Sequence, residues 1–368
     1  MLQMKIVHFH PNGRMAAQFI TPLQIAERAA GHESLLVTSL CLGQQEEKVI
    51  PFDLSVRNLF GLPVSLWKVC SLLKRVRPEV VYSHNTKSSL LPLLGAWLAG
   101  IQVRVYFNHG VPYVGYKGLL RSFLRMLERL NCSLATTVVT VSKDMQLIFH
   151  SEIQGVQAQI ILNGSASGID LSAFSFGRYC RADWRQAHGL REDDFVAIYL
   201  GRPERRKGFE LVLKLWADNF REDRFKLVLC GPTQADVLKI LPALPANVIS
   251  LGFIHNVPEV LACSDILILP SLHEGLSYAI MEAQASGLVV VANDIKGIQC
   301  LVENGVNGYL VKDNSLQVFA EIIYKIEQDR VSLANMRQRA IVSVAKFSRD
   351  LFIPAYISFL NRLLKDKT

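Results

Sequence analysis

Short apolar runs alternate with longer amphipathic stretches along the whole chain. Runs such as 266–269 are continuously apolar, which is typical of strands buried on both faces of a parallel sheet. The stretches between the runs place apolar residues every three or four positions, the spacing of helices packed on one side. The pattern therefore predicts an α/β fold with doubly wound parallel sheets.

The order of these elements predicts two domains. In the first half, strands are expected at 5–9, 35–39, 80–83, 103–108, 137–141 and 159–162, and helices at 19–30, 63–75 and 90–99. A polar, glycine-bearing stretch at 163–168 interrupts the alternation. Strands resume at 195–200, 225–230, 248–251, 266–269 and 289–292, and a last helical pattern covers 349–365. We expect Rossmann-like domains at 1–165 and 169–348, facing a central cleft at the carboxyl ends of their strands.

Composition narrows the class of protein. The chain has 368 residues, half of them hydrophobic, which suffices for two cores. Its apolar runs fall short of the roughly 18 residues of a membrane span, and residues 1–10 lack the order of a signal peptide. The cysteines are scattered without a Cys-x-x-Cys, so we expect reduced, mostly buried thiols in a cytoplasmic protein rather than disulfides or a zinc site. They are Cys41, Cys70, Cys132, Cys180, Cys230, Cys263 and Cys300.

The positive charge is concentrated in the first half. Residues 1–165 carry 16 Lys+Arg against 9 Asp+Glu, whereas the remainder carries 24 against 23. A basic first half predicts an anionic partner, which leaves nucleic acid, acidic lipid headgroups and a phosphorylated acceptor as candidates.

The strongest candidate for chemistry is the stretch 271–283. It follows the predicted strand 266–269 and opens a helix that stops at Gly287. Glu274, Gly275 and Ser277 therefore lie where the unpaired N–H groups and positive dipole of a helix start favour an anion such as a phosphate. Glu282 follows Glu274 by about two helical turns, so both carboxylates are expected to face one crevice.

These residues resemble a known family. Glu274 and Glu282, separated by seven residues and preceded by His273, look like the Glu-x7-Glu motif of retaining glycosyltransferases of family 4. Two further matches are the Gly-Arg…Lys-Gly loop at 201–208 and the strand-end pair His109-Gly110. The resemblance implies the GT-B architecture, with the terminal helix 349–368 crossing back to the first domain. It also implies a nucleotide-sugar donor, by preference a UDP-sugar, and no metal or other cofactor, in keeping with the absence of Asp-x-Asp.

The resemblance also implies roles for individual residues. Those expected to take part in catalysis are His109, Arg202, Lys207 and Glu274. Arg202 and Lys207 would neutralise the departing diphosphate, and Glu282 would bind the ribose hydroxyls. The rest of the donor site is Gly13, Gly252, Phe253, Gly275, Leu276 and Ser277. In that set, Gly13 would approach the phosphate, Gly252 and Phe253 the nucleobase, and Gly275 to Ser277 the sugar or phosphate.

The resemblance assigns no specific role to several other polar residues near predicted strand ends. Arg205 and Arg206 are interpreted as surface charges. His84 and Asn85 either line the acceptor side or form an ordinary capped helix start.

Two basic stretches in the first half bear on what the protein binds besides the donor. Stretches 66–77 and 113–129 have the pattern of basic amphipathic helices, which suits either an anionic membrane surface or an ordinary packed helix. With the family resemblance, we expect a polyprenyl-diphosphate-linked saccharide acceptor, peripheral attachment to the inner face of the cell membrane, a role in surface polysaccharide synthesis, and no nucleic acid. The alternatives are a GT-B epimerase or hydrolase, a non-catalytic polyanion- or lipid-binding protein, and a dinucleotide oxidoreductase. Against the oxidoreductase, the Gly-x-Gly-x-x-Gly motif that binds a dinucleotide follows none of the predicted strands.

Overall fold

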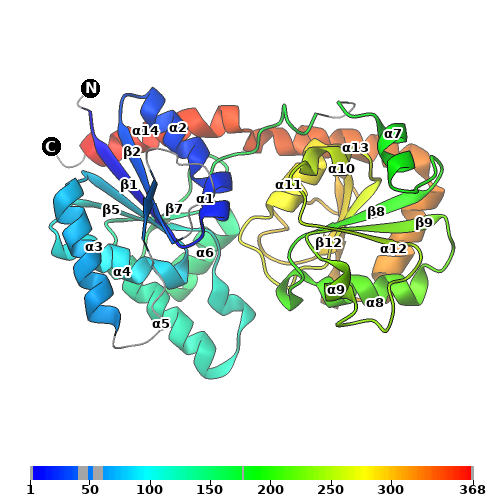
Figure 1. Cartoon of the computed structure of the whole chain (residues 1–368), viewed down its shortest axis with the longest axis horizontal. Helices are drawn as coiled ribbons and strands as arrows, with labels where there is room; N and C mark the ends of the chain where they lie inside the picture. Colours follow the sequence, from blue (N-terminus) through cyan, green and yellow to red (C-terminus); the bar gives the residue numbers. More distant parts are fainter. Residues whose placement is uncertain (1–2, 40–48, 53–60, 176–177, 366–368) are drawn as a thin grey trace. The chain divides into compact units, whose positions relative to one another are not determined.

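The chain forms two compact units, each built on one parallel sheet (Figure 1). The computed structural model describes residues 3–39, 49–52, 61–175 and 178–365. Unit 1 comprises Met1–Gly168 together with Arg349–Thr368, and unit 2 comprises Ile169–Ser348. The predicted α/β class with two Rossmann-like halves is confirmed.

Unit 1 contains a seven-stranded sheet with the order β3-β2-β1-β4-β5-β6-β7, and its strands pair in parallel. The strands are β1 (Lys5–His10), β2 (Glu33–Thr38), β3 (Val49–Pro51), β4 (Val80–His84), β5 (Val103–Asn108), β6 (Thr137–Thr140) and β7 (Ala158–Gln159). Because they are parallel, their carboxyl ends and the residues that follow meet at one edge of the sheet.

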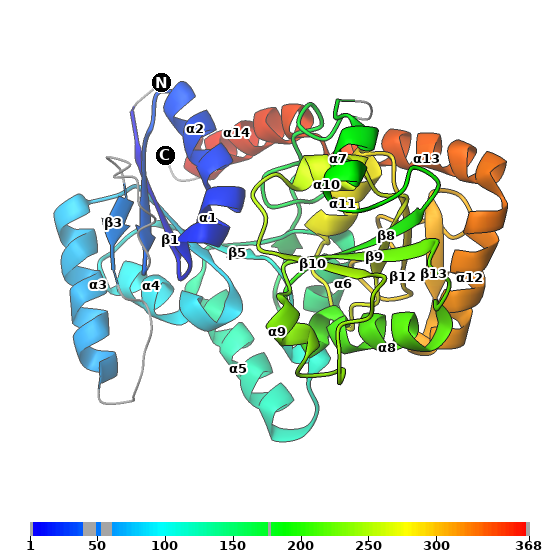
Figure 2. The same cartoon turned by 45° about the vertical axis from the view of Figure 1, so that its right-hand side comes forward.

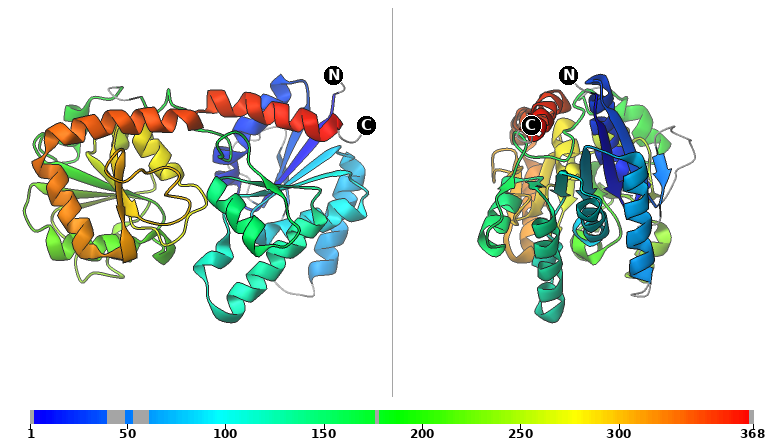
Figure 3. Two further views of the ribbon diagram at one scale, coloured as in Figure 1. Left: turned by 180° about the vertical axis from the view of Figure 1, so that it is seen from behind. Right: turned by 90° about the vertical axis from the view of Figure 1, so that its left-hand side faces the viewer.

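Helices cover both faces of this sheet. They are α1 (Gly13–Phe19), α2 (Thr21–Ala29), α3 (Leu62–Val76), α4 (Thr86–Leu98), η2 (Pro112–Gly115), α5 (Gly118–Leu134), α6 (Lys143–Glu152) and α14 (Arg349–Lys365). α3, α4 and α5 pack side by side on one face, whereas α1 and α2 lie on the other (Figures 1 and 2). The view from behind shows α14 on the α2 side, so the end of the chain completes the first unit (Figure 3).

Unit 2 has a six-stranded parallel sheet with the order β10-β9-β8-β11-β12-β13. Its strands are β8 (Phe195–Leu200), β9 (Phe225–Cys230), β10 (Val248–Gly252), β11 (Ile266–Leu269), β12 (Val289–Asn293) and β13 (Gly308–Val311). Its helices are α7 (Arg181–Ala187), η3 (Arg205–Lys207), α8 (Phe209–Asn219), α9 (Gln234–Val237), α10 (Val257–Ala262), α11 (Tyr278–Ala285), η4 (Lys312–Asn314), α12 (Leu316–Gln328), α13 (Arg330–Val344) and η5 (Ala345–Phe347). α8 and α12 pack on one face, and α11 and α13 on the other.

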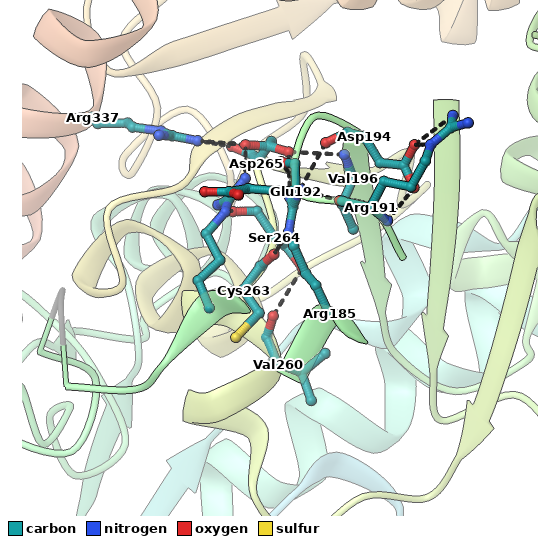
Figure 4. Close-up of polar contacts among 11 residues, drawn as sticks. Arg185, Arg191, Glu192, Asp194, Val196, Val260, Cys263, Ser264, Asp265 and Arg337 are labelled. Carbon is teal, nitrogen blue, oxygen red and sulfur yellow. Dashed lines mark hydrogen bonds and ion pairs between the residues drawn. The ribbon is translucent and has the colours of Figure 1, made fainter. Parts of the chain in front are cut away.

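A buried carboxylate ties the start and end of unit 2 to its sheet (Figure 4). Asp265, directly before β11, accepts hydrogen bonds from Arg181 at 2.6 Å, Arg185 at 2.9 Å and Arg337 at 3.0 Å. Burial acts to raise the pKa of Asp265, but the charges of Arg181 and Arg185 outweigh it and hold the pKa below its usual value. This cluster lies at the amino ends of the strands, opposite the edge expected to bind ligand, and its role is structural.

Several elements differ from the sequence prediction. The helix expected at 19–30 corresponds to α2, which has Pro22 in its first turn, whereas α1, which precedes it, was not predicted. The short strands β3 and β13 were not predicted, and β7 ends at Gln159 rather than Leu162.

The cysteines only partly match their expected burial. Cys132, Cys230 and Cys263 are buried, whereas Cys180 is exposed. Cys41 lies outside the described residues.

Candidate functional site

The loops that follow β8 and β11 pack backbone to backbone at the carboxyl edge of the unit 2 sheet. Gly208 has a φ of +73° at the start of α8, and a Cβ there would overlap the carbonyl of Pro270. Gly297 has a φ of +83°, and its Cβ would overlap the carbonyl of Glu274. Only glycine combines this backbone conformation with this approach, so both glycines fix the loop that carries Glu274.

Lys207 and Glu274 form an ion pair inside this packed edge. Nζ of Lys207 lies 2.7 Å from Oε1 and 3.0 Å from Oε2 of Glu274. Glu274 is only 4% exposed, so its charge needs a partner. The structure thus joins two residues that the sequence had assigned separate roles. An ammonium has three donors, so Lys207 retains capacity for a further oxygen ligand.

The arginines of the 201–208 loop differ in their exposure and in their contacts. Arg202 is exposed and pairs with Glu204 at 2.7 Å. Arg205 is exposed as expected, and the Arg206 side chain is 40% exposed. Arg206 lies 3.8 Å from Glu204, and its side chain also donates to the carbonyl of His273 at 3.4 Å. It therefore supports the Glu274 loop, a contact that charge pattern alone does not reveal.

The residues before α11 form the helix start that the sequence predicted. Ser277 is the residue before the first turn, and it and Leu276 are buried. The Ser277 hydroxyl is buried and meets no hydrogen-bond partner among the described residues, so it retains hydrogen-bonding capacity at the dipole-positive end of α11. Glu282 is half-buried within the same helix. Its ribose contact stays a prediction.

The expected nucleobase residues lie at the end of β10. Gly252 accepts a hydrogen bond from the N–H of Gly231 at 2.7 Å, which ties this turn to the loop after β9. Phe253 is 66% exposed, and its ring meets His255 edge-on at 5.0 Å. An exposed aromatic ring at this edge offers a flat surface on which a base could stack.

In unit 1, His109 belongs to a cluster of histidines at the carboxyl ends of β1, β4 and β5. Nε2 of His109 lies 2.8 Å from Nδ1 of His84, and Nε2 of His84 lies 3.1 Å from Nδ1 of His8. Nε2 of His8 lies 3.1 Å from Oε1 of Glu27. His84 is fully buried, so the prediction that its side chain lines an acceptor surface is wrong.

Gly13 and Asn85 also lie at this edge. Gly13 begins α1, and the Asn12 side chain caps that helix by accepting from Met15 N at 3.2 Å. Asn85 occupies the residue before α4 but makes no side-chain capping hydrogen bond. Its Nδ2 instead lies 2.8 Å from Nε2 of His10, so the capped-start interpretation is also wrong.

Burial lowers the pKa values of His10, His84 and His109 and keeps these three imidazoles neutral at neutral pH. It lowers the pKa of His109 to about 3, with a smaller contribution from the charge of His10. It lowers the pKa of His10 to about 4, and that of His84 well below its usual value. His8, His10 and Glu27 were not singled out from the sequence. The signal was present, because His8 and His10 are polar residues inside an otherwise apolar strand.

The turn that carries His109 is held by a second buried network. Asn108 Oδ1 accepts from the N–H of Gly110 at 2.8 Å, and Asn108 Nδ2 donates to Oε1 of Glu128 at 2.8 Å. Tyr106 donates to the same oxygen at 2.6 Å. Burial raises the pKa of Glu128 to about 7.

Over the described ranges, no group of three or more His, Cys, Asp or Glu side chains is arranged to hold a metal ion. Likewise, no helix in those ranges combines the length and apolar character that crossing a membrane requires.

Comparison with known proteins defines the class to which this fold and site belong. Residues 181–343 match the family described as glycosyl transferases group 1, and residues 20–164 match the glycosyl transferase 4-like domain. The chain therefore belongs to the family 4 glycosyltransferases with the GT-B fold. This assignment favours a transferase over the oxidoreductase and the non-catalytic binding protein considered above.

Individual relatives are similar over most of the chain. An Escherichia coli UDP-Gal:alpha-D-GlcNAc-diphosphoundecaprenol alpha-1,3-galactosyltransferase is 27% identical over 73% of this chain and 70% of its own length. The Staphylococcus aureus capsular polysaccharide biosynthesis glycosyltransferase CapM is 24% identical over 86% of this chain and 85% of its own length. The crystal structure of Anabaena HepE in complex with UDP and glucose aligns with a TM-score of 0.83 at 21% identity, over 98% of this chain and 100% of that one.

Proposed function

We propose that this glycosyltransferase moves a hexose or N-acetylhexosamine from a UDP-sugar to a lipid-linked saccharide, with retention of anomeric configuration, in surface polysaccharide synthesis. The observation that carries the proposal is the buried Lys207–Glu274 pair, 2.7 Å apart, beside the start of α11. An ammonium fixed by a buried carboxylate next to a helix amino end suits the binding of a diphosphate.

Unit 2 would bind the nucleotide. Lys207 and Arg202 would contact the diphosphate, and Glu282 would accept hydrogen bonds from the ribose hydroxyls. Glu274, with the N–H groups of residues 275–277, would hold the transferred sugar. The base would lie against Gly252 and Phe253, and Gly13 of unit 1 would serve the donor phosphate.

The chemistry follows from where charge develops. As the bond from the sugar to the diphosphate breaks, negative charge gathers on the departing phosphate oxygen and positive charge on the sugar ring. Preorganised cations and N–H groups lower the barrier by stabilising that phosphate. Retention would result from attack on the same face of the sugar that the diphosphate leaves, with the acceptor proton passing to the departing phosphate. No metal is assigned to this step.

The names of two similar proteins support the choice of ligands. The E. coli relative's name specifies a UDP-sugar and a diphosphoundecaprenol-linked acceptor, and HepE was crystallised with UDP and glucose. These are the ligand classes to test first, with UDP-galactose and UDP-N-acetylglucosamine as donors.

The surface of α5 supports a membrane-bound acceptor. Its outer face exposes a stripe of apolar side chains, led by Leu119 at 90% exposure. The stripe consists of Leu119, Leu120, Phe123, Met126 and Leu130. Lys117 and Arg129 flank it and are exposed, whereas Arg121 and Arg125 contact Glu152 of α6. An apolar stripe flanked by lysine and arginine suits docking on anionic lipid at the cytoplasmic face, with no role for nucleic acid.

The donor assignment is tested by thermal melting with UDP, GDP, ADP, NAD and single-stranded DNA. A ligand at about 100 times its Kd stabilises the fold by roughly 2.7 kcal/mol. We expect UDP to raise the melting midpoint of the wild type and of Glu303→Ala, an exposed control, but not of Glu282→Ala. A midpoint that rises with DNA and with none of the nucleotides would overturn the proposal.

The reaction is tested with a UDP-sugar and a lipid-linked saccharide. We expect transfer with the anomeric configuration of the donor, read from the proton coupling constant of the product. Conversion of the UDP-sugar without an acceptor would indicate the epimerase or hydrolase instead.

A further inference from the structure

A continuous path of buried hydrogen bonds runs from His109 through His84 and His8 to Glu27. The three links measure 2.8, 3.1 and 3.1 Å. The path joins β5, β4 and β1 to α2, and it ends at Tyr356 of α14, whose hydroxyl donates to Glu27. All of these elements belong to unit 1. The path therefore connects a residue proposed to contact sugar with a carboxylate that is remote in sequence.

The inner end of the path is a buried ion pair. Glu27 is fully buried, and burial acts to raise its pKa. The charge of His8 and the hydrogen bonds from His8 and Tyr356 outweigh burial and lower the pKa overall, so Glu27 is a carboxylate. Of the described residues, only His8 can place a positive charge within ion-pair distance of it. A buried carboxylate without a cation is costly, which favours the protonated form of His8.

Other titratable groups that face this pair stay uncharged. Tyr82 of β4 stacks on His8 with 4.7 Å between ring centroids, and burial, followed by the charge of Glu27, raises the pKa of Tyr82. Burial and the same charge raise the pKa of Tyr356. His10 and His84 have lowered pKa values. Glu27 and His8 are thus the charged members of the cluster.

The ion pair fixes the direction of every hydrogen bond in the path. A protonated His8 donates Nε2–H to Glu27 and Nδ1–H to Nε2 of His84. A neutral His84 must then carry its proton on Nδ1 and donate it to Nε2 of His109. His109 is also neutral, so its one proton is on Nδ1. A neutral His8 would still donate Nε2–H to Glu27, but the two hydrogen bonds between the histidines would reverse and leave Nδ1 of His109 without a proton.

We propose that Glu27 is a positioning residue for His109, and that its ion pair with His8 makes His109 present Nδ1–H as a hydrogen-bond donor to an oxygen atom of the sugar. Among the described residues, the hydrogen bond that the His109 ring makes is the one through Nε2 to His84. The inference rests on the proposed function only for the identity of the ligand. The order of the hydrogen bonds is a property of unit 1 itself.

Which ring nitrogen of His109 carries the proton is measured by ¹⁵N NMR of the full-length protein labelled at histidine. The His109→Gln variant identifies the His109 signals. We expect a protonated Nδ1 and an unprotonated Nε2 in His109 of the wild type. Glu27→Gln removes the carboxylate charge but keeps the side-chain shape. With the amide oxygen accepting from Nε2–H of a neutral His8, we expect the reverse. Glu33→Gln, which removes a carboxylate of β2 outside the path, should retain the wild-type pattern.

The functional readout separates positioning from folding. We expect Glu27→Gln to bind UDP as the wild type does, because that site lies in unit 2, and to turn over the UDP-sugar about tenfold more slowly, the loss of roughly one hydrogen bond. A wild-type His109 with an unprotonated Nδ1 would overturn the proposal, and so would a reversed pattern in Glu27→Gln with unchanged turnover. If Glu27→Gln does not fold, the wild-type spectrum still decides the order. If the wild type turns over no UDP-sugar, the proposed function fails while the NMR result stands.

Discussion

Lys207 and Glu274 meet at 2.7 Å although 67 positions separate them in sequence. One follows β8 and the other follows β11, strands that are neighbours in the unit 2 sheet. Their contact places a single ammonium where two loops converge. The same ammonium then has both a structural task, neutralising a buried carboxylate, and the proposed task of binding phosphate.

Removing the Lys207 charge should affect both the stability of the protein and its binding of UDP, and the two effects can be measured separately. In Lys207→Met, Glu274 remains buried without a cation, and we expect a loss of about 3 kcal/mol in the free energy of unfolding. Lys207→Met combined with Glu274→Gln should recover most of that loss but still show no rise in melting midpoint with UDP. Denaturant unfolding and UDP titration measure the two effects. Recovery of UDP binding in the double variant would contradict a phosphate role for Lys207.

We expect the donor site to require Gly297 because there is no room for a side chain at this position, and not only because of its positive φ. In Gly297→Ala, the new methyl group would push against the carbonyl of Glu274 and displace the loop before α11. We expect UDP affinity to fall at least tenfold, measured by calorimetry. Gly305→Ala is the matched control, because Gly305 has a similar φ of +77° with open space around it. Equal losses in both variants would show that backbone strain is the cause.

Glu128 should make unit 1 less stable as the pH rises. Burial raises its folded pKa to about 7, from 4.5 for an ordinary glutamate. Between these values the folded protein holds a proton that the unfolded chain releases, so the contribution of Glu128 to stability is lost as the pH rises through about 7. Glu128→Gln has no such dependence. Its melting midpoint relative to the wild type should be higher at pH 8 than at pH 5, and the same difference at both pH values would argue against a buried, protonated Glu128.

The apolar stripe of α5 should govern attachment to lipid vesicles. Phe123→Asp places a charge within the stripe, and we expect it to abolish co-flotation with vesicles rich in phosphatidylglycerol while leaving the melting midpoint unchanged. Val331→Asp is the control, because Val331 is 76% exposed on α13 of unit 2. If both variants float like the wild type, α5 is not the docking surface.

The sequence predicted those parts of the fold that local pattern determines. The boundaries of β8, β9 and β11 match the predicted ranges, because buried parallel strands are mostly apolar; Lys226 is the charged exception in β9. β3 and β13 were not predicted because a strand of three or four residues is too short to show a recognisable apolar run. α1 escaped prediction because its first residues belong to a stretch, 11–14, whose proline, asparagine and glycine are typical of a loop.

The candidate site was predictable in part for a similar reason. Local motifs identified Lys207 and Glu274, but no local pattern indicates that they pair. The path from His109 to Glu27 depends on three strands, a helix and the last helix of the chain. Contacts of this kind are set by topology, and neighbouring residues carry little trace of them.

The hydrogen bond between Tyr356 and Glu27 spans 329 positions, which has a consequence for synthesis on the ribosome. The strands of unit 1 emerge early, yet the helix that supplies Tyr356 emerges after all of unit 2. Glu27 therefore gains this partner only after the chain has been synthesised as far as α14. We expect nascent chains that stop before residue 349 to hold an unfinished first unit, in which that carboxylate remains open to water.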